Sequence, residues 1–215
     1  MNISILCTDT NHPVVKSLQE WVDQINSKEN AVSLLFDKSE LPGGDILFLV
    51  SCSQIIEKAE RNKYKFTLVL HASDLPKGRG WSPYIWSILC GANKVTVSLL
   101  EASEPIDSGA IWLKTAFQLE GHELLPEINA KLFAAEMSLM SQAIEQFDSI
   151  KPLQQIGDPG PYMQRRTLAD SRLDPNKTIA EQFDLLRVVD SQRYPAFFDY
   201  QGKRYLINIR KADNE

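Results

Sequence analysis

The chain has 215 residues, of which 43% are hydrophobic and 24% are charged, and these values are ordinary for a folded globular protein. Its formal net charge of −5 argues against a nucleic-acid partner, although a local basic pocket stays compatible with it. The longest apolar runs are too short to cross a bilayer, and the N-terminus lacks the pattern of a signal peptide. Three cysteines without metal-ligand spacing favour reduced thiols, so we expect a cytoplasmic protein with no membrane partner.

Strand and helix patterns alternate along the first 150 residues. Helical spacing is clear in the first helix, where Val15, Leu18 and Trp21 share one face. This alternation predicts an α/β fold with a Rossmann-like wound sheet of mostly parallel strands. Strands are predicted over residues 2–7, 31–36, 45–50, 66–71, 94–100 and 109–119, and helices over residues 12–25, 53–61, 82–92 and 126–147.

The pattern changes at residues 151–166, which are rich in Pro, Gly and Gln and show no periodicity. We therefore predict a main domain over residues 1–150 and a small α+β appendage over residues 151–215. The appendage is predicted to hold a linker, a short helix at 178–189 and a β-hairpin at 196–209 that turns at Gln201-Gly202. We expect the apolar hairpin to pair with a second copy and form a homodimer.

Several binding motifs are absent from the sequence. The turn LCTDTNHP after the first strand holds no glycine, which excludes a phosphate or dinucleotide site of the Rossmann type. GxxxxGK[ST], HExxH and GxSxG are also missing. No metal site is expected, because His12 and His122 lie far from other ligands at suitable spacing. His12 is predicted to cap the first helix, and His122 to lie in an exposed turn.

His71 and Asp107 are the candidate catalytic residues. His71 ends the run FTLVL, and Asp107 lies in the turn PIDSG between two predicted strands. Ligands of open α/β sheets bind at the carboxyl ends of strands, where we expect both residues to lie. An aspartate beside a histidine fixes its tautomer and stabilises its charged form, which suits a general base for an attacking amine. The alternative is that Asp107 is only a turn residue and His71 only ends a strand.

The stretch HASDLPKGRGWSPYIWSILCGANKVTVSLLEASEPIDSGAIW resembles the core signature of the folate-dependent formyltransferases. That family includes enzymes acting on methionyl-tRNA, glycinamide ribonucleotide and sugar nucleotides. The segment 165–212 resembles the part that follows the catalytic domain in the sugar and methionyl-tRNA enzymes. The resemblance implies a formyltransferase fold, 10-formyltetrahydrofolate as formyl donor and His71 with Asp107 as the proton-handling pair. The matching positions are His71, Ser73, Leu75, Pro76, Arg79, Gly80, Pro83, Asp107 and Gly109.

The same resemblance implies binding residues for both substrates. We expect the acceptor to be a nucleotide-linked amino-deoxy sugar, and one candidate is a UDP-linked 4-amino-4,6-dideoxy sugar of a pseudaminic-type pathway. A methionyl-tRNA acceptor is disfavoured because the part after residue 150 is short and mixed in charge. Trp81 either forms a wall of the binding pocket or belongs to the ordinary core. Arg165 and Arg166 either contact a pyrophosphate or are plain surface charges. The pterin of the donor would be held by Ser53, Gln54, Ile55, Ser103, Pro105, Ile106 and Asp107, and the acceptor by Ser73, Lys77, Arg79, Trp81, Arg165 and Arg166.

One position departs from the family pattern. Val69 stands where the family has a catalytic asparagine, two residues before the histidine, and valine cannot donate to an oxyanion. Either another donor serves, with protonated His71 as the first candidate, or the protein is a catalytically impaired homologue that binds folate or a sugar nucleotide. A formyltransferase acting on another small amine, such as glycinamide ribonucleotide, is a further alternative. A second departure is Asp74 beside the histidine, where the family prefers leucine.

Overall fold

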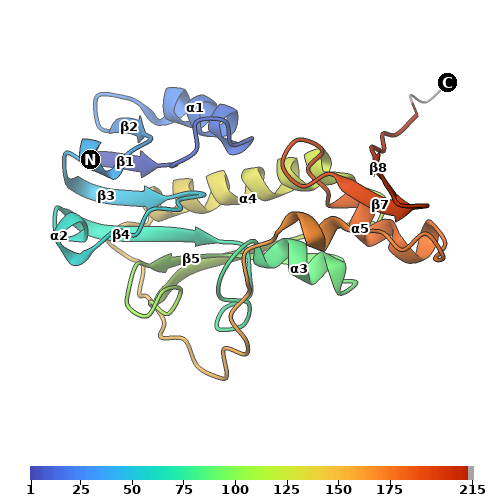
Figure 1. Ribbon diagram of the computed structural model, residues 1–215. Helices are drawn as coiled ribbons and strands as arrows, with labels where there is room; N and C mark the ends of the chain where they lie inside the picture. The colour runs from blue at the N-terminus through green and yellow to red at the C-terminus, as the bar shows by residue number, and fades with distance from the viewer. Residues whose placement is uncertain (213–215) are drawn as a thin grey trace.

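A computed structural model describes residues 1–212 and shows a six-stranded sheet in the order β2-β1-β3-β4-β5-β6, with a separate two-stranded sheet near the C-terminus (Figure 1). These two sheets confirm the predicted α/β fold and the predicted C-terminal hairpin. The strands are β1 (Asn2–Leu6), β2 (Ala31–Leu35), β3 (Gly44–Leu49), β4 (Tyr64–His71), β5 (Lys94–Glu101), β6 (Ile111–Gln118), β7 (Ala196–Tyr200) and β8 (Lys203–Ile207). The helices are α1 (Val14–Ile25), α2 (Lys58–Arg61), α3 (Pro83–Leu89), α4 (Leu125–Glu145) and α5 (Phe183–Arg187).

Strands β1 to β4 are parallel, whereas β5 runs antiparallel to both of its neighbours. The central strand β3 is apolar on both faces, as expected for a parallel strand that is covered on both sides. The sheet is therefore mostly parallel, as predicted. The reversed direction of β5 was not predicted, and it decides where the loop after β5 lies.

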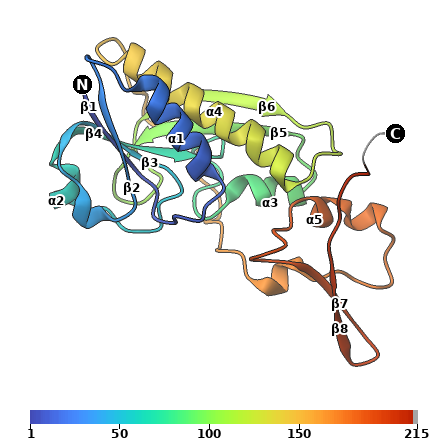
Figure 2. The ribbon, with the colours of Figure 1, turned by 90° about the horizontal axis from the view of Figure 1, so that it is seen from above.

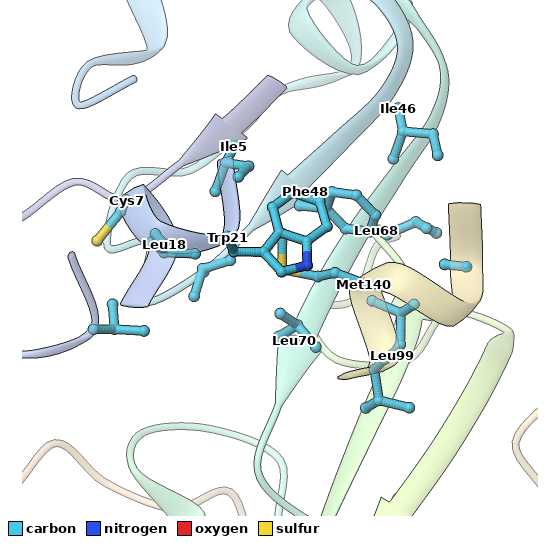
Figure 3. Packing of buried hydrophobic residues seen from close by; sticks show 14 of the residues in the cluster. Ile5, Cys7, Leu18, Trp21, Ile46, Phe48, Leu68, Leu70, Leu99 and Met140 are labelled. Carbon is cyan, nitrogen blue, oxygen red and sulfur yellow. The ribbon is translucent and has the colours of Figure 1, made fainter. Parts of the chain in front are cut away.

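The main hydrophobic core fills the space between one face of the sheet and the helices α1 and α4. These two helices lie side by side over that face (Figure 2). Trp21 of α1 contacts Phe48 of β3 edge to face, with ring centroids 6.3 Å apart (Figure 3). The Trp21 indole also donates to Ser141 Oγ of α4 at 2.9 Å, which joins the two helices. Leu68 and Leu70 point from β4 into the same core.

The opposite face carries a smaller apolar cluster, which includes residues next to the short helix α2 and to a 3₁₀ turn at Lys38–Glu40. The predicted helix over 53–61 is wrong in its first half, because helical backbone begins only at Lys58. Residues before it are held in loop conformation: Ser51 has a φ of 49°, and the Ser53 amide donates to Thr8 Oγ1 at 2.8 Å. Loops instead of long helices therefore cover much of this face.

Residues 151–166 run along the main sheet and its loops (Figure 1). Leu153 forms a β-bridge with Ile111, and Met163 forms one with Gly80. The predicted linker is thus attached to the main domain at two points, and the predicted boundary at residue 150 stays a prediction.

The C-terminal hairpin turns at Gln201 and Gly202, as predicted. Their φ values of 48° and 73° match a two-residue turn that needs positive φ at both positions. The helix predicted over 178–189 is shorter than expected and consists of a 3₁₀ turn at Ala180–Gln182 followed by α5. Among residues 1–212, no helix has both the length and the apolar character needed to cross a membrane.

Candidate active site

His71 lies at the end of β4 on the face that loops cover. Side chains alternate between the two faces of a strand, and Leu68 and Leu70 point into the main core. Val69 and His71 therefore point to the opposite face, where Val69 packs against the smaller cluster. The sheet thus presents the histidine to the loops and away from the two long helices.

The imidazole of His71 has two different neighbours. Its Nε2 lies 2.8 Å from the Gly78 carbonyl oxygen. A carbonyl can only accept, so Nε2 carries the proton in this contact. Its Nδ1 lies 3.7 Å from Asp107 Oδ1, and both side chains are buried. Nδ1 is therefore the nitrogen free to take up a proton, and the nearby carboxylate stabilises the cation that results.

Asp107 reaches this position from a loop that leaves the sheet early. Because β5 is antiparallel, its end lies beside the middle of β4, where the Ala102 amide donates to Thr67 O at 2.8 Å. This loop therefore starts away from the carboxyl edge of the parallel strands, although its Asp107 lies beside His71 at that edge, as expected. The loop turns back across the face toward His71, and its Asp107 has a φ of 60°. The Asp107 carboxylate accepts from the Gly80 amide at 2.9 Å, which aims it at the histidine.

The two segments predicted to hold the pterin are tied together by Arg61. Its guanidinium donates to Ile56 O at 3.3 Å and to Glu104 Oε1 at 3.0 Å. The first segment includes Ile55 and the second includes Ile106, and both isoleucines are exposed. The side chain of Gln54 is engaged elsewhere, because its Nε2 donates to Asp37 Oδ2 and its Oε1 accepts from the Lys38 amide. Ser103 bonds Ser108 across the base of its own loop, beside Pro105.

The residues predicted to contact the acceptor are only partly brought together. Trp81 is 37% exposed, and the Arg165 guanidinium lies 5.1 Å from its ring centroid, so these two form an exposed cation–π pair. Lys77 is exposed, and Arg79 is half-buried on the same loop.

Ser73 and Arg166 are buried. The Ser73 carbonyl accepts from Ser98 Oγ at 2.7 Å, which ties the loop to β5. Arg166 donates to the carbonyls of Asp170 and Val188 and to Ser171 Oγ. Its guanidinium therefore braces the C-terminal segment and is not presented to solvent as the pyrophosphate expectation requires.

A pocket of about 380 Å³ opens beside the Asp107 loop. Arg79 and Tyr162 line it together with Ile106 of the Asp107 loop. Burial, and then the nearby Asp107 carboxylate, raise the pKa of the Tyr162 hydroxyl. Sequence reasoning missed Tyr162 because the segment around it shows no periodicity. The residues that line the pocket are Arg79, Pro105, Ile106, Pro159, Gly160 and Tyr162.

The histidines outside the site lie as predicted. His12 Nδ1 accepts from the Val14 amide at 3.2 Å at the start of α1, and His122 lies in an exposed turn beside Glu120. Val69 packs among apolar neighbours that include Cys52 and Ala102. No group of three or more His, Cys, Asp or Glu suited to a metal ion occurs within residues 1–212.

Fold and site together define a Rossmann-like α/β protein whose buried His–Asp pair is suited to proton transfer. The sequence pattern of the family described as formyl transferase matches residues 7–144, more than half of the chain. The chain belongs to the formyl transferase family. The resemblance inferred from the stretch around His71 and Asp107 is therefore confirmed.

Among curated relatives, methionyl-tRNA formyltransferase from Rickettsia felis is 28% identical over 172 residues, and that from Rickettsia rickettsii (strain Iowa) is 30% identical over 172 residues. Each alignment covers 79% of this chain and 55% of the relative. The chain therefore spans about half the length of the curated relatives it matches.

Solved structures share the fold over nearly the whole chain. Methionyl-tRNA formyltransferase from Clostridium thermocellum has a TM-score of 0.82 at 25% identity, covering 99% of this chain and 94% of that one. A 4-N formyltransferase from Francisella tularensis has a TM-score of 0.77 at 16% identity, covering 99% and 98%. HypX from Aquifex aeolicus in complex with tetrahydrofolic acid has a TM-score of 0.79 at 23% identity, covering 96% and 37%.

Proposed function

We propose that this protein transfers a formyl group from 10-formyltetrahydrofolate to the amine of a nucleotide-linked amino-deoxy sugar. The observation that carries the proposal is the buried His71–Asp107 pair, with Nδ1 free toward the carboxylate and Nε2 engaged by Gly78 O. Membership of the formyl transferase family supports the reaction type. The finer choice of a UDP-linked 4-amino-4,6-dideoxy sugar belongs to the same proposal.

The donor fits the two loops joined by Arg61. A pterin offers a flat apolar face and polar edges, and the loops supply exposed Ile55 and Ile106 together with backbone amides and carbonyls. A HypX structure with bound tetrahydrofolic acid shares the fold, which supports folate as the carrier. When bound, the donor supplies the formyl group, which is attached to a nitrogen of the folate. After transfer, this nitrogen belongs to the tetrahydrofolate product.

His71 handles the proton that moves in this exchange. As the acceptor amine forms its bond to the formyl carbon, the amine loses a proton to His71 Nδ1. As the bond from that carbon to the folate nitrogen breaks, His71 returns the proton to the departing nitrogen. Asp107 stabilises the cation between these two steps, and the buried setting strengthens that attraction.

The exposed Trp81–Arg165 pair supports a nucleotide-linked acceptor. An indole face can stack on a nucleobase, and a guanidinium matches a phosphate with two donors. A 4-N formyltransferase and two further proteins described as sugar N-formyltransferases share the fold over nearly the whole chain. The curated relatives are methionyl-tRNA enzymes, so that acceptor belongs in the test.

A second candidate function follows from Val69. Its side chain is packed among apolar neighbours and cannot donate to an oxyanion, which fits a homologue that binds folate or a sugar nucleotide without rapid turnover. This candidate predicts tight binding with no formylated product.

The experiment incubates the protein with 10-formyltetrahydrofolate and a panel of acceptors: amino-sugar nucleotides, glycinamide ribonucleotide and methionyl-tRNA. Mass spectrometry reads which amine gains a formyl group. Product from an amino-sugar nucleotide that disappears in His71→Ala supports the proposal. Product from tRNA alone, or binding without product, replaces it with the corresponding alternative.

A further inference from the structure

Gln155 is half-buried within a segment whose neighbouring residues 151–154 and 156–158 are exposed. Its side chain makes three hydrogen bonds to two separate loops. Nε2 donates to Asp107 O at 2.9 Å and to Gly109 O at 2.9 Å, and Oε1 accepts from Arg79 Nη2 at 2.8 Å. One amide thus joins three parts of the chain that are far apart in sequence.

The orientation of this amide follows from its partners. Arginine can only donate and carbonyls can only accept, so the oxygen must face Arg79 and the nitrogen must face the two carbonyls. The bridge between Leu153 and Ile111 holds the segment two residues earlier, with mutual amide–carbonyl bonds of 2.8 and 2.9 Å. Gln155 is therefore delivered to this place by backbone pairing.

The turn that Gln155 holds has a strained backbone at Asp107, the residue that contacts His71. Asp107 has a φ of 60°, a conformation that L-residues adopt at a cost and keep only when their surroundings enforce it. Gln155 binds the carbonyls on both sides of Ser108, so the backbone of the turn cannot rotate without breaking one of these bonds. The same turn sets the direction of the carboxylate toward His71 and the Gly80 amide.

We propose that Gln155 is a positioning residue that holds the Asp107 carboxylate against His71, from a segment outside the α/β core. The effect on formyl transfer rests on the proposed function, whereas the effect on the Asp107 loop does not. The donated bonds carry the role, and the contact with Arg79 only orients the amide.

Two variants separate these contributions. Gln155→Glu keeps the length and the Arg79 contact but replaces the donor by a carboxylate oxygen that faces two carbonyls. Gln155→Ala removes all three bonds. We expect both to lower kcat by about a hundredfold, since small displacements of catalytic groups cost rates of this order. Gln154→Ala, at an exposed neighbouring position, serves as the matched control and should keep the wild-type rate.

Hydrogen exchange followed by mass spectrometry gives a readout that needs no turnover. In both Gln155 variants, peptides covering residues 102–110 and the Gly80 amide should exchange faster than in wild type and in Gln154→Ala. Unchanged exchange in these peptides, or a Gln155→Glu variant with wild-type kcat, would overturn the inference. If wild type formylates no acceptor, the proposed function fails and the exchange data alone decide the inference.

A double-mutant cycle tests whether Gln155 acts through Asp107. In an Asp107→Asn background, Gln155→Ala should cause little further loss of kcat, because the group it positions has already lost its charge. A full, additive loss in that background would show that Gln155 acts elsewhere and would overturn the assignment.

Discussion

His71 Nδ1 and Asp107 Oδ1 lie 3.7 Å apart, although His71 ends β4 and Asp107 lies in the loop between β5 and β6. The approach depends on the antiparallel course of β5, which ends beside the middle of β4 and sends its loop back over the histidine. The Gly80 amide then fixes the carboxylate from the other side. In the proposed mechanism, the loop after β5 and the loop that holds Gly80 therefore organise proton transfer at the end of β4.

Asp107→Asn should lower kcat by about a hundredfold to ten-thousandfold, the range typical of general acid–base groups. Asparagine can still accept from the Gly80 amide, so the loop should keep its shape while the negative charge beside His71 is lost. Steady-state kinetics with thermal unfolding as a folding check measures this. Asp74→Asn is the control, because the exposed Asp74 pairs with Lys114 and lies outside the pair. Equal rates for wild type and Asp107→Asn would exclude a role for the charge.

Val69→Asn should raise kcat by about tenfold or more, because one oxyanion donor contributes a hundredfold or more in related chemistry. Val69 is half-buried, so the amide can be accommodated at a modest cost in stability. Val69→Leu, which changes size without adding a donor, controls for packing. A kcat that stays at or below the wild-type value in Val69→Asn would mean that another group already stabilises the oxyanion.

Gly109→Ala should destabilise the fold by about 3 kcal/mol, or prevent folding, since overpacking at a rigid contact costs energies of this order. A Cβ at this position would lie only 1.8 Å from the Glu101 carbonyl oxygen, and backbone cannot swing aside as a side chain can. Urea denaturation measures the loss. Ser108→Ala, at the neighbouring position, adds no atom and should cost far less. A Gly109→Ala variant of wild-type stability would mean that this loop is free to move.

Glu136→Gln should make the protein more stable at neutral pH. Burial raises the pKa of Glu136 in α4 to about 8 from an ordinary value of 4.5. Between these pH values the folded state binds a proton that the unfolded state has lost, so the free energy of unfolding falls by about 1.4 kcal/mol per pH unit as pH rises. The loss is about 3 kcal/mol at pH 7. Glutamine carries no charge and removes this slope.

The check is urea denaturation of wild type and Glu136→Gln at several pH values from 4.5 to 8. The two stabilities should differ little near pH 4.5 and diverge steadily above it. Glu145→Gln on the same helix is the control, because that side chain is exposed. Parallel curves for wild type and Glu136→Gln would show that the buried carboxyl titrates normally.

Much of this protein could be read from local sequence. The apolar runs placed the six strands of the main sheet, and the Gln201-Gly202 pair placed the hairpin turn, because side-chain periodicity and positive-φ turns are properties of neighbouring residues. The stretch around His71 and Asp107 identified the family, and it contains the two residues that the structure brings together as a buried pair. These signals are local, or depend on fixed spacing along the chain, and can therefore be recognised from the sequence without the structure.

The remaining features depend on which distant segments meet. The direction of β5, the burial of Arg166 beside an exposed Arg165, and the reach of Gln155 to the Asp107 turn follow from backbone pairing and packing between remote parts of the chain. Arg165 and Arg166 are adjacent and look alike in sequence. In the packed structure, Arg166 donates to Ser171 within the C-terminal segment, whereas Arg165 lies over the Trp81 ring. Sequence determined the chemistry available at the site, and tertiary structure decided which groups hold it in place.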